Sequence, residues 1–284
     1  MRKPKRIRLA GVLGNPIAHS LSPNLHGFWI RRYAIDGYYI PMLVNKNEVG
    51  KSIESLKTLG FSGANVTIPF KEEVIKYVDN VSKIGANIGA VNTISINTKG
   101  EVSAENTDVY GFIKNLDSAV PEWENDVNNV VILGGGGASR AVVAALKNKN
   151  IKTKRVINRS IEKPYLIKEE IDNEIEIVNW NNLADVVEDC DMLINSTSLG
   201  MKGQPSLEID TSIMKKKAIV YDLVYTPLET ELIKSAKKNQ IKFIGGLGML
   251  MFQALKGFEI WFGKQPEADE ETMLFLKDLL NEKK

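Results

Sequence analysis

Apolar and polar residues alternate along the first hundred positions in a way that predicts strands and helices in turn. Strand-like segments are expected over 6–13, 37–44 and 63–68, and a hairpin over 89–106 with its turn at 98–100. Helical spacing of apolar residues is found after Pro23, over 46–60 and over 71–85. The pattern therefore predicts an α/β unit with an antiparallel edge.

A second pattern begins near residue 129, where short apolar runs show no alternation. Residues 130–133 are all apolar, as in a parallel strand that is buried on both faces. Similar strands are expected at 154–158, 176–179, 191–195, 218–224 and 242–246, with helical segments between most of them. A connecting helix is expected over 108–121, and two helices at 248–262 and 267–282 close the chain.

These patterns predict an α/β protein with two domains. The first is an N-terminal α/β domain with a mixed sheet, formed by residues 1–107 and 247–284. The last two helices belong to it because they have no strand of their own to cover, so we expect them to pack back on the first sheet. The second, residues 108–246, is predicted to be a Rossmann-like, doubly wound dinucleotide-binding domain.

Composition narrows the class of protein. The chain has 284 residues, of which 43% are hydrophobic and 25% charged, as is usual for soluble globular proteins. Its 37 basic and 35 acidic residues argue against a nucleic-acid binder. The single cysteine, Cys190, excludes an internal disulfide, and no ligand spacing predicts a metal. No apolar run reaches the roughly 18 residues of a membrane helix, so we expect a cytoplasmic protein with no membrane partner.

A run of glycines after the first buried strand of the second domain predicts a dinucleotide site. Gly134 and Gly136 permit a tight turn, and Ala138 can replace the small third residue of the usual fingerprint. The following helix directs its free N–H groups at an anion, usually a pyrophosphate. The alternative is an ordinary glycine-rich turn between a strand and a helix.

The residues at the end of the next strand indicate whether NAD or NADP is bound. Asn158, Arg159 and Ser160 follow it, with Lys163 nearby, where NAD-binding domains commonly place a carboxylate. Because an arginine pairs with a 2′-phosphate and a carboxylate repels it, this end predicts NADP rather than NAD. Glu162 argues in the other direction, and a solvent-facing charge is the alternative for Arg159.

Two hydroxyls precede the first helix. Ser20 and Ser22 are two residues apart, so in an extended segment their side chains point the same way. Ser22 directly precedes Pro23 and is therefore also a candidate N-cap. Together they form a possible seat for a small carboxylate, and an ordinary cap with an uninvolved serine is the alternative.

The segment 63–72, GANVTIPFKE, places polar residues on one face of a strand and a lysine past its end. Asn65 and Thr67 share one face, Pro69 stops the ladder, and Lys71 follows. The alternatives are a half-buried strand with a solvated lysine and a strand that ends at a site so that the lysine reaches it.

Nine segments in this order resemble the shikimate dehydrogenases, NADP-dependent oxidoreductases of aromatic amino-acid biosynthesis. They are GNPIAHSLSP (14–23), GANVTIPFKE (63–72), GAVNTI (89–94), ENTDVYGF (105–112), GGGGASR (134–140), NRS (158–160), NSTSLGM (195–201), YDLVYTPLET (221–230) and GGLGMLMFQA (245–254). The resemblance covers nearly the whole chain. It implies a two-domain enzyme that reversibly reduces 3-dehydroshikimate to shikimate by hydride transfer from NADPH, with its active site between a substrate-binding first domain and an NADP-binding second domain.

The resemblance also implies a role for residues that match the family position by position. Lys71 matches the catalytic lysine, and Ser20 and Ser22 match serines that hold the substrate carboxylate. The ring hydroxyls would be bound by Thr67, Asn92, Asp108 and Gln253, with Tyr225 at the same site. The cofactor would be bound by Gly134, Gly135, Gly136, Gly137 and Ala138 at the pyrophosphate, by Asn158, Arg159, Ser160 and Lys163 at the 2′-phosphate, and by Leu223 and Gly246 near the nicotinamide.

Lys71 and Asp108 are predicted to have different roles in the reaction. Oxidation of an alcohol requires a proton to leave as the hydride departs, and a lysine within hydrogen-bond reach can accept it. We therefore predict that Lys71 is the acid/base and that Asp108 orients it.

Two other functions remain as alternatives to shikimate dehydrogenase activity. A relative that accepts quinate as well as shikimate, or uses NAD, is the nearest alternative, and a metabolite sensor without catalysis is a remote one. Three positions depart from common forms of the family and bear on cofactor preference: Gly135 replaces a frequent alanine, Lys163 a common arginine, and Lys83 a frequent acidic residue. A homodimer formed at a sheet edge is also possible.

Overall fold

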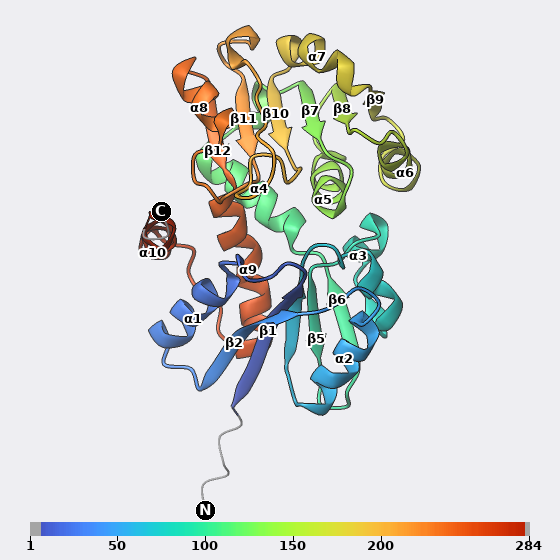
Figure 1. Ribbon diagram of the computed structural model, residues 1–284, viewed down its shortest axis with the longest axis vertical. Helices are drawn as coiled ribbons and strands as arrows, with labels where there is room; N and C mark the ends of the chain where they lie inside the picture. Colours follow the sequence, from blue (N-terminus) through green and yellow to red (C-terminus); the bar gives the residue numbers. More distant parts are fainter. Residues whose placement is uncertain (1–6, 282–284) are drawn as a thin grey trace, which may run out of the picture. The chain divides into compact units, whose positions relative to one another are not determined.

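The computed structural model describes residues 7–281 and divides them into two compact units (Figure 1). One unit contains the residues up to Thr107 together with Gln253–Leu276, and the other contains Asp108–Phe252 with the described residues after Leu276. Each unit is built on a six-stranded sheet of these described residues. The predicted α/β fold class is confirmed.

The first unit has a mixed sheet in the order β2-β1-β3-β5-β6-β4. β1 is parallel to β2 and β3, whereas β5 is antiparallel to β3 and β6, as the predicted hairpin requires. The strands are β1 (Arg8–Gly14), β2 (Gly37–Leu43), β3 (Gly63–Val66), β4 (Asn80–Val81), β5 (Thr93–Ile96) and β6 (Val102–Glu105). The helices that follow them are α1 (Ser22–Arg32), α2 (Val49–Thr58) and α3 (Lys83–Ile88).

Helices cover both faces of this sheet. α2 packs its buried Val49, Ile53 and Leu56 against strand residues such as Val66 and Ile94. The opposite face carries aromatic residues of β2, of α1 and of α9 (Gly246–Phe262). Successive strand residues point to opposite faces, which is why one strand serves both layers.

The C-terminal part of the chain returns to the first sheet. The indole of Trp261 on α9 donates to the carbonyl of Ile94 at 2.9 Å. α10 (Glu270–Asn281) contacts α1, where the indole of Trp29 donates to the Thr272 hydroxyl at 3.2 Å and Arg32 pairs with Asp269 at 2.6 Å. Residues 253–276 are therefore part of the first unit, and the division between the units falls within α9.

The prediction of one helix over 71–85 is wrong. This stretch forms a short 3₁₀ helix, η1 (Glu73–Tyr77), then β4, and then the start of α3. Two side chains account for the interruption: the carboxylate of Asp79 accepts the backbone N–H of Val102 at 2.7 Å, and Ser82 caps α3 by accepting the N–H of Gly85 at 3.1 Å. Pairing with β6 thus competes successfully with helix propagation.

The second unit has a fully parallel sheet in the order β12-β11-β10-β7-β8-β9. Numbered from β7, this is the order 3-2-1-4-5-6 of doubly wound dinucleotide-binding domains, with the reversal between β7 and β10. The strands are β7 (Asn129–Leu133), β8 (Thr153–Ile157), β9 (Glu176–Val178), β10 (Met192–Asn195), β11 (Ile219–Asp222) and β12 (Lys242–Gly245). The helices are α4 (Asp108–Ala119), α5 (Gly137–Leu146), α6 (Glu162–Glu170), α7 (Leu183–Asp189) and α8 (Glu231–Lys238), and the 3₁₀ helices are η2 (Trp123–Asn125), η3 (Trp180–Asn182) and η4 (Thr211–Ile213).

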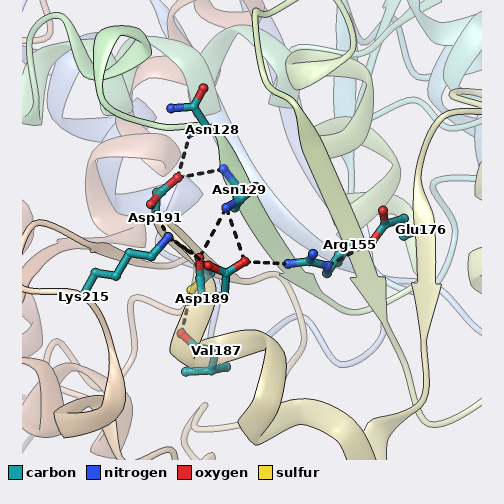
Figure 2. Close-up of polar contacts among 9 residues, drawn as sticks. Asn128, Asn129, Arg155, Glu176, Val187, Asp189, Asp191 and Lys215 are labelled. Carbon is teal, nitrogen blue, oxygen red and sulfur yellow. Dashed lines mark hydrogen bonds and ion pairs between the residues drawn. The ribbon is translucent and has the colours of Figure 1, made fainter.

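A polar cluster holds the amino ends of these parallel strands together (Figure 2). One carboxylate oxygen of Asp191 accepts the backbone N–H groups of Asn128 and Asn129, each at 2.9 Å, and the other accepts from Lys215 at 2.9 Å. Burial by itself would raise the pKa of Asp191, but these hydrogen bonds outweigh it and the pKa lies below its usual value. The neighbouring Cys190 is buried, which raises the pKa of its thiol to about 12 and makes it a packing residue.

Candidate active site

The site residues of the first unit lie where β1 and β3 end and antiparallel β5 begins. The N–H of Thr67 donates to the carbonyl of Leu13 at 3.0 Å, and that of Val66 donates to the carbonyl of Asn92 at 2.8 Å. The carbonyl of Lys71 accepts the N–H of Val91 at 2.8 Å. These backbone bonds place the turn that carries Lys71 beside the segment that carries Asn92.

Ser20 and Ser22 lie at the amino end of α1, but Ser22 is not the N-cap that the sequence predicted. Leu21 occupies the N-cap position, Ser22 is the first helical residue, and Pro23 follows it. The backbone N–H of Ser22 donates to the Ser20 hydroxyl at 3.3 Å, so Ser20 satisfies one of the free helical N–H groups. Both serines therefore lie at the positive end of a helix, which suits a bound carboxylate.

The strand GANV is shorter and more buried than its alternation suggested. β3 ends at Val66. Asn65 is buried like its apolar neighbour Val66, with 6% of the residue exposed against 1% for Val66. The Asn65 amide nitrogen donates to the carbonyl of Asn92 at 3.0 Å and to the hydroxyl of Thr93 at 3.1 Å. The half-buried strand is thus ruled out, and Asn65 serves to connect β3 to β5.

Asn92 and Gln253 come together from distant parts of the sequence, as the resemblance implied for two residues of one site. The amide nitrogen of Asn92 donates to the side-chain oxygen of Gln253 at 3.2 Å and to the hydroxyl of Thr107 at 3.0 Å. The N–H of Thr107 donates to the side-chain oxygen of Asn92 at 2.8 Å. All three are buried polar residues, so this network fixes the orientation of the Asn92 amide.

Asp108 and Tyr225 belong to the second unit. Asp108 is the first residue of α4 and is buried, and it directly follows the Thr107 that binds Asn92. Tyr225 is partly buried in the loop after β11. Lys71 is partly buried in the turn after β3. The catalytic and binding roles of these residues stay predictions.

The glycine loop after β7 has the shape that a pyrophosphate requires. Gly134 has a φ of +125°, and a Cβ there would lie 2.5 Å from the Ser139 hydroxyl, so only glycine fits. At Gly136, which precedes α5, a Cβ would meet no atom within 4 Å. This open space lies at the amino end of a helix and at the reversal of strand order, which is where doubly wound sheets bind dinucleotides.

The end of β8 brings the predicted 2′-phosphate residues against this loop. A Cβ on Gly135 would lie 2.7 Å from the Cβ of Lys163 and 3.3 Å from the Asn158 side chain. Ser160 donates its hydroxyl proton to Glu162 at 2.5 Å, and this bond lowers the pKa of the Glu162 carboxyl. Arg159 and Lys163 are exposed and supply the positive charge at this end of the sheet.

Leu223 and Gly246 are in direct contact at the carboxyl ends of β11 and β12. A Cβ on Gly246 would lie 2.0 Å from the carbonyl oxygen of Leu223, and the N–H of Leu223 donates to Asn195 at 2.9 Å. The absence of a side chain at Gly246 therefore lets the first turn of α9 approach β11.

Sequence reasoning missed the buried side chains around Asn65. Tyr39 donates its hydroxyl proton to Asn65 at 2.6 Å, and His26 stacks on the Tyr39 ring. The buried Thr93 and Thr107 complete the network. No local signal marks these side chains, because tyrosine and histidine at such positions are equally common as packing residues.

Within residues 7–281, no helix is long and apolar enough to cross a membrane. In the same part of the chain, no group of three or more His, Cys, Asp or Glu residues is arranged to hold a metal ion.

Comparison with known proteins places the chain in a family. The family described as "Shikimate dehydrogenase substrate binding domain" matches residues 12–94, and the one described as "Shikimate / quinate 5-dehydrogenase" matches residues 118–219. A relative from Paramagnetospirillum magneticum, named shikimate dehydrogenase (NADP(+)), is 41% identical over 95% of this chain and 98% of its own.

Solved structures agree with this placement. The shikimate 5-dehydrogenase of Thermus thermophilus, in complex with NADP(H) and shikimate, has a TM-score of 0.84 at 28% identity, covering 97% of this chain and 99% of its own. The quinate dehydrogenase of Corynebacterium glutamicum, in complex with NAD, has a TM-score of 0.87 at 28% identity, covering 95% of this chain and 99% of its own. The resemblance seen in the nine segments is confirmed, and the chain belongs to the shikimate dehydrogenase family.

Proposed function

We propose that this protein interconverts shikimate and 3-dehydroshikimate with NADP, and that Lys71 is its acid/base. Membership of the family supports the reaction and the cofactor. The observation that carries the role of Lys71 is the backbone bond from Val91, which sets the lysine turn beside Asn92 and the end of β3. We assign substrate binding to residues 1–107 with 247–284, and NADP binding to residues 108–246.

The substrate is held by polar groups of known placement in the first unit. Ser20 and Ser22, at the amino end of α1, bind the carboxylate. Thr67, Asn92 and Gln253 bind ring hydroxyls, and the fixed orientation of the Asn92 amide makes this binding stereospecific. We also assign a substrate-binding role to Asp108 and Tyr225.

The proton and the hydride leave the same carbon–oxygen group of shikimate. NADP held by the second unit would supply the acceptor for the hydride of the ring carbon that bears the 3-hydroxyl. Lys71 accepts the hydroxyl proton, and it returns that proton to the ketone oxygen in the reductive direction. Asp108 orients the lysine, which is supported by its position directly after the Thr107 that binds Asn92.

The residues of the second unit fit NADP. The loop of Gly134–Ala138 and the amino end of α5 border the open space at Gly136, which suits the pyrophosphate. Arg159 and Lys163, with Asn158 and Ser160, bind the 2′-phosphate. Leu223 and Gly246 lie beside the nicotinamide.

The substitution Lys71→Ala tests the role of the lysine. Turnover is expected to fall about a hundredfold or more, the scale of general acid–base help, with a smaller change in NADP affinity. Lys76→Ala is the matched control, because Lys76 is exposed on the adjacent η1. A Lys71→Ala enzyme within about threefold of the wild-type kcat contradicts the assignment.

One observation keeps a quinate or NAD-linked activity as a second candidate. Glu162, the first residue of α6, accepts a hydrogen bond from Ser160 and follows shortly after the strand end where NAD-binding domains place a carboxylate. Rates with each substrate and cofactor pair separate the two activities. A homodimer stays a prediction, which sedimentation velocity tests.

A further inference from the structure

A buried carboxylate lies at the carboxyl end of β11, directly before the loop that leads to α8. Asp222 is the last residue of β11 and is fully buried. One of its carboxylate oxygens accepts the backbone N–H of Val224 at 3.0 Å and the side-chain N–H of Asn195 at 2.9 Å. The other oxygen accepts the hydroxyl proton of Thr230 at 2.6 Å. Asp222 therefore joins its own loop to β10 and to the start of α8.

Asn195 extends this connection to the loop after β10. It is the last residue of β10, and its amide nitrogen donates to Asp222 and to the carbonyl of Leu199, the latter at 3.1 Å. Its side-chain oxygen accepts the backbone N–H of Thr197 at 3.1 Å and the hydroxyl of the same residue at 2.7 Å. Because the amide uses both of its protons and both lone pairs of its oxygen, it holds a single orientation towards Asp222.

Thr230 extends the connection to α8. It is the N-cap of this helix, where its hydroxyl oxygen accepts the N–H of Ile233 at 3.3 Å. A threonine hydroxyl has one proton, and here that proton goes to Asp222. Asp222 and Thr230 flank the loop of residues 223–229, so this one bond ties the two ends of the loop together.

Two backbone bonds fix the loop 223–229 between its ends. The N–H of Leu223 donates to the carbonyl of Asn195 at 2.9 Å, and the carbonyl of Thr226 accepts the N–H of Lys202 at 2.9 Å. Tyr225 lies between these two points in the chain. The path of the loop is therefore set on both sides of Tyr225.

Hydrogen bonds alone hold the Asp222 carboxylate. Burial raises the pKa of this carboxyl, and the bonds from Thr230, Val224 and Asn195 oppose the rise, whereas no cation in the described part of the chain contributes. A buried carboxylate without an ion partner is costly, so it adds little net stability. What it supplies is a set of directed acceptors at the end of β11.

We propose that Asp222 is a positioning residue for the reaction, because it fixes the loop that presents Leu223 to the nicotinamide and Tyr225 to the substrate. This inference rests on the proposed roles of Leu223 and Tyr225. Asp222 lies at the carboxyl edge of the parallel sheet, where doubly wound folds bind their ligands. Since it is fully buried, it acts through the backbone of the loop.

The substitution Asp222→Asn changes the carboxylate and keeps its shape. The amide keeps one oxygen for Asn195 and Val224, but its nitrogen cannot accept the proton of Thr230. We expect kcat/KM for shikimate to fall about tenfold or more, because a small displacement of groups around a reacting atom is costly. The Kd of NADP in calorimetry is expected to stay within about threefold of wild type, because the glycine loop and the end of β8 are unchanged.

Asp191→Ala is the matched control for a loss of stability. It removes a carboxylate that accepts two backbone N–H groups at the opposite, amino edge of the same sheet. We expect this variant to have a lower unfolding temperature but a kcat/KM within about twofold of wild type, measured where both proteins are folded. A purely structural role of Asp222 would give the same result for Asp222→Asn.

The pair Thr230→Val and Thr230→Ser tests the same bond from its other partner, and does so even where Asp222→Asn fails to fold. Valine removes the hydroxyl with little change in size, whereas serine keeps it. We expect Thr230→Val to lower kcat/KM for shikimate at least about threefold and Thr230→Ser to stay within about twofold of wild type. Circular dichroism melting checks that each variant is folded.

The outcomes separate this inference from the proposed function. If the wild type does not reduce NADP with shikimate, the proposed function is wrong and the inference falls with it. If the wild type is active, three results overturn only the role of Asp222: a folded Asp222→Asn enzyme with wild-type kcat/KM, an equal loss of kcat/KM in Asp191→Ala, or equal kinetics of the two Thr230 variants.

Discussion

His26 gives the structure a specific dependence of stability on pH. The residue is fully buried among aromatic rings, and neither ring nitrogen has a hydrogen-bond partner within the described part of the chain. Burial lowers the pKa of His26 from 6.5 to about 3, because the charged imidazolium would lose its hydration. The folded protein therefore keeps this ring neutral at pH values where the unfolded chain protonates it.

The sign and size of the effect follow from these two pKa values. The stability that neutral His26 contributes is fully present above about pH 6.5 and is lost as the pH falls toward about 3. Each unit of pH in this window costs about 1.4 kcal/mol of unfolding free energy. At about pH 5 the loss is therefore about 2 kcal/mol relative to neutral pH.

The substitution His26→Phe isolates this contribution, since it keeps a flat ring and removes the titrating group. Urea unfolding, followed by circular dichroism at about pH 7.5 and about pH 5, gives the change in unfolding free energy for each protein. Other groups titrate in both proteins, so we expect the wild type to lose about 2 kcal/mol more than the variant.

Nuclear magnetic resonance offers a direct control because the chain has only two histidines. The carbon–proton signal of the imidazole that is missing in His26→Phe identifies His26. We expect that signal to keep its neutral position at about pH 5. A His26 signal that titrates near pH 6.5, or an equal loss of stability in both proteins, would refute the reasoning.

Further predictions concern the glycine loop and the polar cluster of Figure 2. Gly136→Ala is expected to leave the unfolding temperature unchanged, because its Cβ meets no protein atom within 4 Å, but to weaken NADP binding in calorimetry at least about tenfold. Gly135→Ala, unlike Gly136→Ala, is expected to lower the unfolding temperature, because the added Cβ would lie 2.7 Å from the Cβ of Lys163. Equal unfolding temperatures for the two variants would contradict this. Asp191→Ala is expected to cost about 1–3 kcal/mol of unfolding free energy, because two backbone N–H groups lose their acceptor. Asp189→Ala, which removes exposed ion pairs and a long, exposed hydrogen bond from the Asn129 side chain at 3.4 Å, is the control and is expected to cost under about 1 kcal/mol.

The parallel sheet of the second unit could be predicted because strands that are buried on both faces are continuously apolar in sequence. Residues 130–133 and 218–221 are continuously apolar, and the structure buries each of them completely or almost so. The strand order and the glycine loop then follow from the alternation of strands and helices.

Predictions failed where tertiary hydrogen bonds override local preference. The stretch 71–85 has helical spacing, but Asp79 binds β6 and Ser82 starts a new helix. Ser22 before Pro23 has the composition of an N-cap, but Ser20 accepts the N–H of Ser22. Neither competition is visible in the local sequence.

The residues of the candidate site also fall into two groups, those that the sequence indicated and those that became apparent only in the structure. Gly134 lies in a local motif whose spacing indicates a dinucleotide loop, and Lys71 lies in a segment that resembles the family, so the sequence could indicate both. Tyr39 and His26 act through contacts with residues far along the chain, such as Asn65 and Phe258. Burial and pairing of this kind become apparent only in the folded structure.

The central claim is that this protein oxidises shikimate with NADP. The most direct test is the initial rate of nicotinamide reduction, measured by absorbance, with shikimate and quinate each paired with NADP and NAD. We expect shikimate with NADP to exceed every other pair by about tenfold or more in kcat/KM. No reduction with shikimate would contradict this activity, and a comparable rate with quinate or NAD would contradict the roles given to Arg159 and Lys163.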